Sequence, residues 1–479
     1  MLTGPIVQND LFDIIMQFRT HKVVFTADVQ QMYRQFLINK EDRPFQRILW
    51  RDSQEEPLRI FELNTVTYGT MSAPFLATWA LLQLTKKEQH RFPRGAEVIS
   101  RDMYVDNLLS EIQSLEQALQ LKEEIIQLLQ SGGLVLRKWI SNDTQFMQSF
   151  THQNNDPHLL LNFTKVQKTL GIGWIPQQDL LVYRINLTPE PSKITKRVIL
   201  SQIATLIDPL GLLDPIIVAA KIFLSPCGNY ILAGMTWCLL QWNHIRDELP
   251  IINQLAFTRQ ICISDPINVQ LHAFADASEA AYGACIFLRP TNKKGSYLVN
   301  LVCSKSRVAP LKRISFPRLE LCAALLLSRL FTAVRDTIGL PLQRIILWSD
   351  STIIVLQWIQ TPPHRLKTFV ANRITKIQQH TKHLEWRHVP SNDNPADIIS
   401  RVLTPKQLMK SHLWKHGPPW LGQQEENWPN QERSIPDISE LQTFISSSSN
   451  NDTWTLHCFS TIDTLQRIIA WCYRFIRNS

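Results

Sequence analysis

The 479-residue chain lacks several patterns that would assign it to a common class of protein. Its eight cysteines are scattered without a Cys-x-x-Cys pair, which argues against a disulfide framework or a cysteine-rich zinc site and fits a reducing compartment. The N-terminus has no basic segment followed by an apolar core, and no run of about 18 apolar residues offers a membrane span. The sequence shows no internal repeat. We therefore expect a soluble intracellular protein that is neither secreted nor embedded in a membrane.

The composition is sufficient for buried hydrophobic cores, since 44% of the residues are hydrophobic. A chain of this length corresponds to about two to four ordinary domains. The net charge of +9 and the pI of about 9.1 favour polyanionic partners. Many basic proteins bind no nucleic acid, so the charge alone assigns no function.

The first half of the chain reads as an antiparallel α+β sheet with helices on one face. Residues 23–38 read as a strand, a turn near Asp28 and a short helix or second strand, and two strands flank a polar hairpin at 53–57. One helix opens at Pro74 and another follows Ser114, where Gln117 completes a capping box. A strand then covers 133–141.

A polar run at 149–158 suggests a boundary, and residues 159–265 contain helical segments with several Trp and Pro residues. The residue pattern changes from Gln270 onward, where alternating apolar and polar residues are typical of strands. Three strands, a helix with Pro at its start and Gly after its end, a buried strand and a helix capped by Ser351 indicate a mixed α/β domain. The segment after Arg401 reads as a loosely folded tail with a helix-like end at 464–475.

Four acidic residues in the second half occupy positions that a purely structural role explains poorly. Asp276 falls within a strand, where Asp has low propensity, and Glu320 interrupts an apolar helix. Asp350 ends a strand and Asp397 lies near the start of a last short helix. Each alone could be a solvated loop acid or a helix cap. Together they resemble a set of hard oxygen ligands, because clustered carboxylates resist ionising together unless cations such as Mg²⁺ neutralise them.

The motifs "FADAS", "RLEL", "WSDS" and "NPAD" resemble, in this order and spacing, the Asp-Glu-Asp-Asp set of the ribonuclease H fold. Longer stretches, including "KSRVAPLKRISFPRLELCAALLLSRL" and "WRHVPSNDNPADIISR", resemble the polyprotein of Bel/Pao-type LTR retrotransposons over roughly residues 1 to 425. The resemblance implies a reverse transcriptase palm at 1–150 with the fingers largely missing, a thumb or connection region at 151–268, a ribonuclease H-like domain at 269–402 and a poorly defined tail at 403–479.

The resemblance also gives roles to residues of the first half. "FTADVQQMY" is similar to reverse-transcriptase motif A, which makes Asp28 a metal-binding acid and Tyr33 the aromatic that blocks a ribose 2′-OH. "YGTMSAPFLA", with Tyr68 and Gly69, resembles motif B near the templating base, and "LGIGW" resembles a primer-contacting hairpin. Lys138 follows paired glycines as in the family's next palm strand. From the residues alone, Tyr33 reads equally as a core aromatic and Lys138 as a surface lysine.

Three features depart from the family pattern. "YVDN" stands where the family has Tyr-x-Asp-Asp, so Asp106 keeps the direct metal ligand while Asn107 loses a charge, which implies weaker metal binding. Only 27 residues precede Asp28, from which we expect an incomplete and impaired polymerase half. The loop "VPSNDNPAD" has no histidine; His388 precedes it, and whether it substitutes stays open.

A basic run supports the second half, since six cations face one acid between His364 and His388. It includes Arg365, Lys367, Arg373 and Lys376, which could grip phosphates or form an ordinary solvated helix face. The partners implied by the resemblance are an RNA template, a DNA primer, an RNA–DNA hybrid and deoxynucleotides, with two Mg²⁺ (or Mn²⁺) ions in each active site. The implied compartment is the cytoplasm, a retroelement particle or the nucleus.

The leading hypothesis is a retrotransposon-derived RNA-directed DNA polymerase and ribonuclease H fragment that acts by two-metal phosphoryl transfer. Asp28 and Asp106 would serve the polymerase half, and Asp276, Glu320, Asp350 and Asp397 the nuclease half. The alternative is a non-catalytic nucleic-acid-binding relic. An aspartic peptidase is rejected because no Asp-Thr/Ser-Gly loop occurs, and an integrase because the paired His and Cys of its zinc module are absent.

Overall fold

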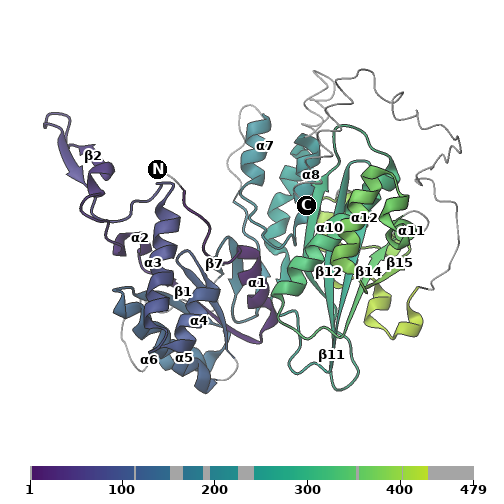
Figure 1. Ribbon diagram of the computed structural model, residues 1–479, viewed down its shortest axis with the longest axis horizontal. Helices are drawn as coiled ribbons and strands as arrows, with labels where there is room; N and C mark the ends of the chain where they lie inside the picture. The colour runs from purple at the N-terminus through teal and green to yellow at the C-terminus, as the bar shows by residue number, and fades with distance from the viewer. Residues whose placement is uncertain are drawn as a thin grey trace, which may run out of the picture. The chain divides into compact units, whose positions relative to one another are not determined.

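A computed structural model of the chain describes seven stretches of sequence (Figure 1): residues 3–112, 115–151, 166–186, 195–224, 242–351, 355–401 and 403–429. Residues Met1–Ile438 group into one compact unit. The fourfold division at residues 150, 268 and 402 stays a prediction. None of the helices in the described stretches is long and apolar enough to cross a membrane.

The first sheet has four antiparallel strands in the order β4-β5-β1-β6. The strands are β1 (Val23–Val29), β4 (Met103–Tyr104), β5 (Asn107–Ile112) and β6 (Leu136–Ser141). The side chains of β1 alternate between two cores, because Val24 and Phe25 point to opposite faces. The sequence-based expectation of an antiparallel α+β sheet is confirmed, except that Asp28 lies inside β1 rather than in a turn.

Helices cover one face of this sheet around a core that contains Phe25, Leu108 and Trp139. They are α2 (Met32–Gln35), α3 (Ala73–Glu88), α4 (Pro93–Asp102), α5 (Leu115–Ser131) and α6 (Thr144–Thr151). The helix expected at Pro74 is α3, and the capping residue expected for α5, Ser114, lies outside the described residues. On the opposite face, α1 (Leu11–Thr20), which the sequence analysis did not predict, packs Ile14, Ile15 and Phe18 into a second core.

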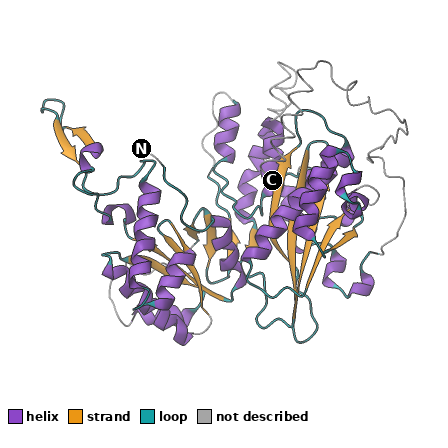
Figure 2. Ribbon diagram, viewed as in Figure 1, coloured by secondary structure: helices purple, strands orange, loops and turns teal. Residues whose placement is uncertain are grey.

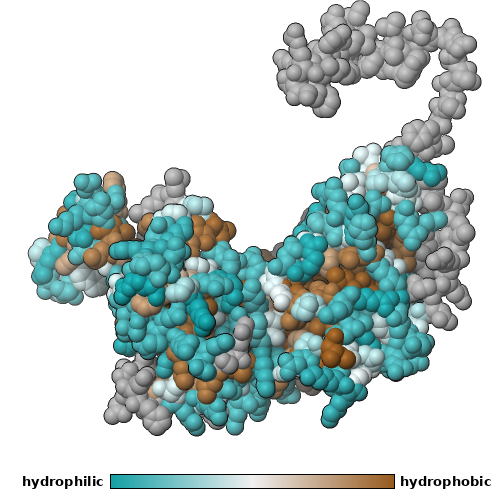
Figure 3. All heavy atoms as spheres, turned by 60° about the horizontal axis from the view of Figure 1, so that its bottom comes forward, coloured by the Kyte–Doolittle hydropathy of each residue, from teal (hydrophilic) through white to brown (hydrophobic). Residues whose placement is uncertain are grey.

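A separate hairpin extends from the first sheet as strands β2 (Arg47–Trp50) and β3 (Arg59–Glu62), which follow the short 3-10 turn η1 (Arg43–Gln46). Every residue of both strands is exposed, and Leu49, Trp50 and Ile60 each expose more than half of their surface. Figure 3 shows some brown, hydrophobic surface on the lobe at its left end, where Figure 1 places β2.

The middle of the chain forms a second antiparallel sheet in the order β10-β9-β8-β7. Its strands are β7 (Gln167–Thr169), β8 (Ile172–Ile175), β9 (Leu180–Val182) and β10 (Ala256–Thr258). The hairpin expected at "LGIGW" is present, with Leu170 and Gly171 at positive φ in its turn. The sequence analysis otherwise predicted helical segments here, which agree with α7 (Lys196–Ile203), α8 (Asp214–Leu224) and η3 (Leu249–Gln254), but it did not predict β9 and β10.

The third sheet is mixed, with strand order β13-β12-β11-β14-β15. Figure 2 shows the strands of the molecule in orange and its helices in purple. Its strands are β11 (Asn268–Ala277), β12 (Ala281–Thr291), β13 (Asn300–Val308), β14 (Arg344–Ser349) and β15 (Glu385–His388). The first three are antiparallel, whereas β14 runs parallel to both β11 and β15. The fold class expected for the second half is confirmed.

Helix α10 (Phe316–Thr337) packs on β11 and β12, and α12 (Thr368–Thr381) packs on α10. Buried Leu319, Ala323, Leu327, Leu330 and Val334 recur every three or four residues along α10, so one stripe faces the sheet. The shorter elements around them are α11 (Val355–Gln360), η4 (Pro363–Arg365), η5 (Ser391–Asp393) and α13 (Asp397–Ser400).

The chain after Arg401 is not the loosely folded tail that its composition suggested, at least as far as residue 429. It forms α14 (Pro405–Lys410), α15 (His412–His416), η6 (Pro419–Gly422) and η7 (Glu425–Asn427). Trp414, Trp420 and Trp428 are buried, and Trp420 packs against Trp348 of β14 with ring centroids 4.9 Å apart. The helix-like segment expected at 464–475 lies outside the described residues.

Two buried arginines connect α1 with distant parts of the chain. Arg19 donates to the carbonyl oxygens of Val302 at 2.6 Å and Leu301 at 3.1 Å on β13, and to those of Thr258 and Arg259. Arg259 in turn donates to both carboxylate oxygens of Asp179 and to backbone carbonyls around α1. The two guanidinium groups therefore tie the N-terminal helix to the second and third sheets.

Candidate active site

The third sheet brings Asp276 and Asp350 side by side. In the parallel pair of β11 and β14, Ala275 is in register with Ser349, and each is followed by one of the two acids. Asp276 exposes only 6% of its surface. Burial first, and then the charge of Asp350, raise the pKa of Asp276 well above the usual range of an aspartate.

Glu320 and Asp397 complete the group from α10 and α13. Burial and the charge of Asp350 raise the pKa of Glu320 to about 7. Burial and the same Asp350 charge raise the pKa of Asp397, although its ion pair with Arg401, at 2.6 Å, opposes the shift. The charge of Asp350 thus acts on all three other carboxyl groups, so the fold gathers the four acids that the sequence motifs single out.

Three serine hydroxyls that the sequence analysis did not assign to the site hold these acids in place. Ser351 donates to Glu320 at 2.6 Å, Ser391 donates to Asp350 at 2.9 Å, and Ser400 donates to Asp276. Each serine lies one to three residues from an acid in the motifs "SDS", "SND" and "ADIIS", which is the signal that could have drawn attention to them. Ser351 was expected to cap the next helix, but residues 352–354 lie outside the described part.

His388, whose role the sequence left open, lies at the end of β15 beside this group. Its neighbour in register on β14 is Ser349, and its ring hydrogen bonds to the backbone of Asp350. Burial lowers the pKa of His388, although the Asp350 charge acts in the opposite direction. The ring therefore favours its neutral form next to the carboxylates.

The four acids match a hard divalent cation in donor type, because Mg²⁺ prefers carboxylate oxygens. A cation would also relieve the repulsion that raises their pKa values. As the side chains stand in the described stretches, no three His, Cys, Asp or Glu residues are close enough together to enclose a metal ion. The type of donor atom thus fits the ion, while the carboxylate groups lie too far apart in this arrangement to enclose it.

The first sheet brings together a second, smaller set of acids. Asp28 on β1 is in register with Asn107 on β5, and Asp106 occupies the turn that precedes β5. The Asn107 side-chain amide donates to the Asp106 carboxylate at 2.7 Å, and the Lys138 ammonium pairs with the Asp28 carboxylate. Burial and the Asp28 charge raise the pKa of Asp106, while Lys138 and Asn107 oppose the shift.

Tyr33 and Tyr68 lie at the edge of this set. Their rings contact each other edge to face, with centroids 4.9 Å apart. Burial, Asp106 and Tyr68 all raise the pKa of the Tyr33 phenol, so Tyr33 lies within electrostatic reach of Asp106. Gly69 has a φ of +80° and would place a side chain in open space. The residues expected at the polymerase site, including Lys138, are therefore neighbours in the fold.

The four basic residues expected to bind substrate divide into two pairs. Arg365 and Lys367 precede α12, whereas Arg373 and Lys376 lie on it. The Arg373 guanidinium stacks 3.5 Å from the centroid of Phe369 and donates to the Phe369 carbonyl at 3.0 Å. Arg373 and Lys376 both line one cavity beside α10.

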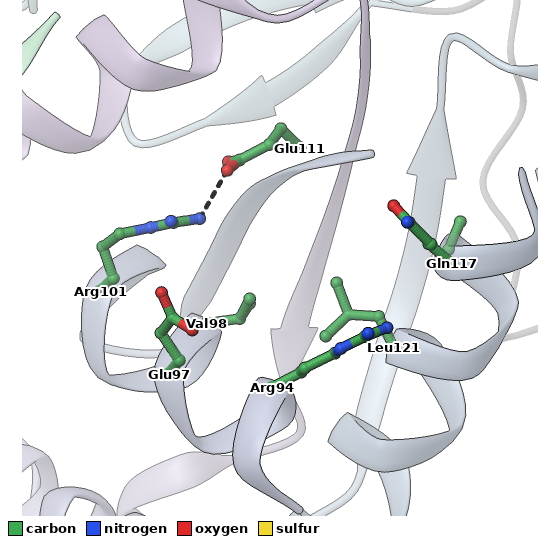
Figure 4. Close-up of a pocket in the computed structure, with 8 residues that line it drawn as sticks. Arg94, Glu97, Val98, Arg101, Glu111, Gln117 and Leu121 are labelled. Atoms are coloured by element: carbon green, nitrogen blue, oxygen red, sulfur yellow. Dashed lines mark hydrogen bonds and ion pairs between the residues drawn. The ribbon is translucent and has the colours of Figure 1, made fainter. Parts of the chain in front are cut away.

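A different cavity of about 310 Å³ lies between α4, α5 and β5, away from Asp28. Figure 4 shows Arg94 and Arg101 facing the same space as Glu97 and Glu111, with Arg101 bonded to Glu111. That contact is 2.7 Å, and Arg101 also pairs with Asp102. Because its cations and acids are balanced, this cavity offers no charge for a ligand to neutralise.

The mixed sheet and the carboxylates that meet on it are similar to a ribonuclease H-like domain. Residues 195–351 match the family model of the Pao retrotransposon-like RNaseH-like domain. Asp276, Glu320 and Asp350 fall inside the matched residues, whereas Asp397, Asp28 and Asp106 fall outside them. The match supports a Bel/Pao-type retroelement polyprotein as the source of this segment.

Three solved structures of a foamy viral protease-reverse transcriptase are similar to the chain at 15% identity. Two of them contain double-stranded DNA, and each gives a TM-score of 0.47. The match to the dRH form covers 81% of this chain and 60% of that chain. The match to the other covers 82% of this chain and 72% of that chain. The third contains an RNA/DNA hybrid and gives a TM-score of 0.42, with 80% of this chain and 46% of that chain covered. The chain thus spans about 60% of the first of these proteins. A comparison with curated proteins gives no match.

Proposed function

We propose that the chain is a retroelement-derived nuclease that cuts the RNA strand of an RNA–DNA hybrid. The observation that carries this proposal is the single carboxylate, Asp350, that raises the pKa of Asp276, Glu320 and Asp397 together. Structural acids are normally paired with cations, whereas four acids that repel one another are typical of a site built for a divalent ion. We infer an intracellular compartment from the scattered cysteines.

Asp276, Glu320, Asp350 and Asp397 would hold Mg²⁺ or Mn²⁺, two ions in the site. When bound, such ions activate a water and stabilise the leaving oxygen of a phosphodiester. The residues of the chain supply the orientation: Ser400, Ser351 and Ser391 fix the carboxylates of Asp276, Glu320 and Asp350 through hydrogen bonds. Neutral His388, bonded to the Asp350 backbone, is placed to accept a proton at its ring nitrogen.

For the first half we propose a polymerase site with reduced activity. Asp28 and Asp106 are adjacent, but Lys138 pairs with Asp28 and the Asn107 amide occupies an oxygen of Asp106. Both contacts neutralise or occupy oxygens that a cation would otherwise use. The same contacts favour the second candidate, a nucleic-acid-binding relic without turnover, as far as this half is concerned.

A cleavage assay with the full chain tests the nuclease. The substrate is a hybrid with a labelled RNA strand, incubated with Mg²⁺, Mn²⁺ or EDTA. We expect cutting that depends on the metal and falls to background in Asp276→Asn. Asp336→Asn is the matched control, because Asp336 is exposed on α10 and, among the residues that the structure describes, forms an ion pair with its neighbour Arg335 alone. Equal cutting by wild type and Asp276→Asn would refute the nuclease, and binding without cutting in either metal would select the relic.

A further inference from the structure

The N-terminal segment, residues 3–10, packs beside the polymerase set, although the sequence analysis gave it no role. Gly4 lies against α3, where an added Cβ would clash with the ring of Phe75. The Asn9 side-chain amide donates to the carbonyl of Arg101, near the end of α4, at 2.9 Å. The segment is therefore fastened at two points, one on α3 and one on α4.

Between these two points, Gln8 contacts the turn that carries Asp106. Tyr104 on β4 pairs with Asn107 on β5, which leaves Val105 and Asp106 as a two-residue turn. The side-chain carbonyl of Gln8, which is half-buried, accepts a hydrogen bond from the backbone N–H of Val105 at 3.0 Å. A side chain from outside the first sheet thus supplies a partner for this turn.

The turn holds Val105 in a strained conformation. Its φ of +55° lies in the left-handed region, which a β-branched residue seldom adopts. A two-residue hairpin turn with positive φ at its first position normally has glycine there. Such a conformation persists only where the surroundings enforce it. Two contacts do so here: Gln8 holds the N–H of Val105, and the N–H of Val29 on β1 donates to the Asp106 carbonyl at 2.8 Å.

The N–H that Gln8 binds belongs to the peptide unit whose rotation changes the φ of Val105. Released from Gln8, this unit can turn over and bring Val105 to a negative φ, which relieves the strain. A turn with negative φ at this position fits the twist of the flanking strands less well. Asp106, the next residue, would then shift relative to Asp28 on β1.

We propose that Gln8 is a positioning residue of the polymerase half: its hydrogen bond to Val105 keeps the turn in the conformation that sets the Asp106 carboxylate beside Asp28. The inference rests on the proposed polymerase site. Gln8 acts through the backbone of the turn and not on a reacting atom, so its loss changes the geometry of the site while every acidic side chain stays in the chain.

Amide hydrogen exchange of the full chain, read on peptides that span the turn, tests the contact without metal or nucleic acid. We expect Gln8→Ala to speed exchange of the Val105 amide about tenfold, as for one lost hydrogen bond. Gln8→Glu retains an acceptor oxygen and should exchange like the wild type. Asn9→Ala is the matched control, because it removes a hydrogen bond of the same segment that ends on Arg101 and not on the turn.

Iron-directed backbone cleavage reports where the carboxylates stand. Fe²⁺ takes the place of Mg²⁺ and, with ascorbate and peroxide, cuts the chain nearby, so fragments that end near Asp106 and near Asp276 report the two sites separately by mass spectrometry. We expect Gln8→Ala to raise the Fe²⁺ concentration for half-maximal cutting near Asp106 about tenfold. Cutting near Asp276 should be unchanged, and Gln8→Glu should behave like the wild type.

A double variant separates positioning from a general loss of structure. Glycine adopts a positive φ without the penalty that valine carries. In the Val105→Gly background, Gln8→Ala should therefore change the Fe²⁺ requirement near Asp106 less than about twofold. Circular dichroism melting confirms that each variant is folded. If Gln8→Ala melts early, Gln8→Leu takes its place, since it keeps the apolar stem and lacks the acceptor.

Primer extension gives the functional readout: Gln8→Ala should lower kcat about tenfold and change the KM for the deoxynucleotide less than about twofold. Two results would overturn the positioning role while the polymerase site stands. One is wild-type exchange of the Val105 amide in Gln8→Ala, and the other is equal effects of Gln8→Ala and Asn9→Ala on iron cutting and on kcat. A wild type that is not cut near Asp106 and extends no primer would refute the polymerase site, and the positioning role with it.

Discussion

At the scale of single residues, Asn107 differs from the acid expected at its position by one charge and one hydrogen-bond donor. Its amide donates to Asp106 at 2.7 Å, which stabilises a carboxylate that burial and Asp28 destabilise. The residue that departs from the family pattern therefore has a structural role in the chain as it stands. An acid in its place would add repulsion unless a cation were bound.

We therefore predict that Asn107→Asp lowers the free energy of unfolding by about 1 kcal/mol without divalent metal, the equivalent of about one pKa unit. Mg²⁺ should restore it, because an ion that binds only the folded state stabilises that state. Melting curves with EDTA and with Mg²⁺ measure both effects. Asn39→Asp, an exposed site on the same half, is the control, and an equal Mg²⁺ shift in all three proteins would contradict the prediction.

A second residue-scale feature is the buried carboxyl group of Asp208. It accepts hydrogen bonds from the Tyr183 hydroxyl and from the backbone amides of Leu212 and Leu213. Burial and the charge of Asp214 raise its pKa to about 6, from an ordinary value of 3.8. Between about pH 4 and pH 6 the folded state therefore binds the proton that the unfolded state has lost.

It follows that the contribution of Asp208 to stability is fully present below about pH 4 and is lost as the pH rises through 6. The loss is on the order of 1–3 kcal/mol. We predict that Asp208→Asn flattens the pH dependence of the melting temperature in this window, whereas exposed Asp247→Asn leaves it unchanged. A wild-type profile in Asp208→Asn would show that another group titrates.

At the scale of elements, the segment from α14 to η7 is part of the third sheet's core. Trp414 is fully buried and donates its indole N–H to the Leu212 carbonyl at 2.9 Å, next to α8. Trp420 donates to Asp393 at 3.2 Å and Arg289 donates to the Leu421 carbonyl at 2.7 Å. Rings and hydrogen bonds together fasten this segment to both β12 and the start of α8.

Removing the largest of these anchors should be costly. We predict that Trp414→Ala lowers the free energy of unfolding by about 3–5 kcal/mol, because it leaves a cavity and an unpaired carbonyl. Denaturant unfolding followed by circular dichroism measures the change. Trp50→Ala is the control, since Trp50 is 56% exposed on β2 and should cost less than about 0.5 kcal/mol. A similar cost for both variants would mean that the segment is not anchored through Trp414.

The sequence predicted some elements well and others poorly, for physical reasons. Strand β11 and helix α10 are long, with continuous burial in one and a three-to-four spacing in the other, so their patterns are clear. Strands β7 to β10 have three or four residues each, too few for any period to show. The acids were identified from their motifs. The serines stand in the same motifs, but the acids that they bond lie 31, 41 and 124 residues away, and no local spacing reveals those pairings.

At the scale of the whole molecule, α1 is joined to the other sheets through Arg19. Its guanidinium serves four carbonyl oxygens, two of them on β13. Burial lowers its pKa only to about 10, so it stays charged at neutral pH. Because it is buried within the compact unit Met1–Ile438, its loss would leave several polar atoms without partners at once.

We predict that Arg19→Ala lowers the free energy of unfolding by about 3–5 kcal/mol. The first and third sheets should become less stable together, since Arg19 joins α1, which packs on β5 of the first sheet, to β13 of the third. Amide hydrogen exchange on peptides of β1 and of β13 measures each separately. Arg34→Ala, at an exposed position on α2, should leave both unchanged, and faster exchange confined to the β1 peptides would contradict a shared role.

The reach of Arg19 also has a consequence for how the chain is made. Its acceptors on β13 lie 282 and 283 residues further along the sequence. At roughly 5–20 residues per second, a ribosome needs about a quarter of a minute to a minute to add them. During that time α1 is out of the tunnel with its cation and part of its apolar face unsatisfied. The first sheet to be synthesised is thus among the last to be finished, and a ribosome that stalls before residue 302 would release an N-terminal half that presents this face to chaperones or to other nascent chains.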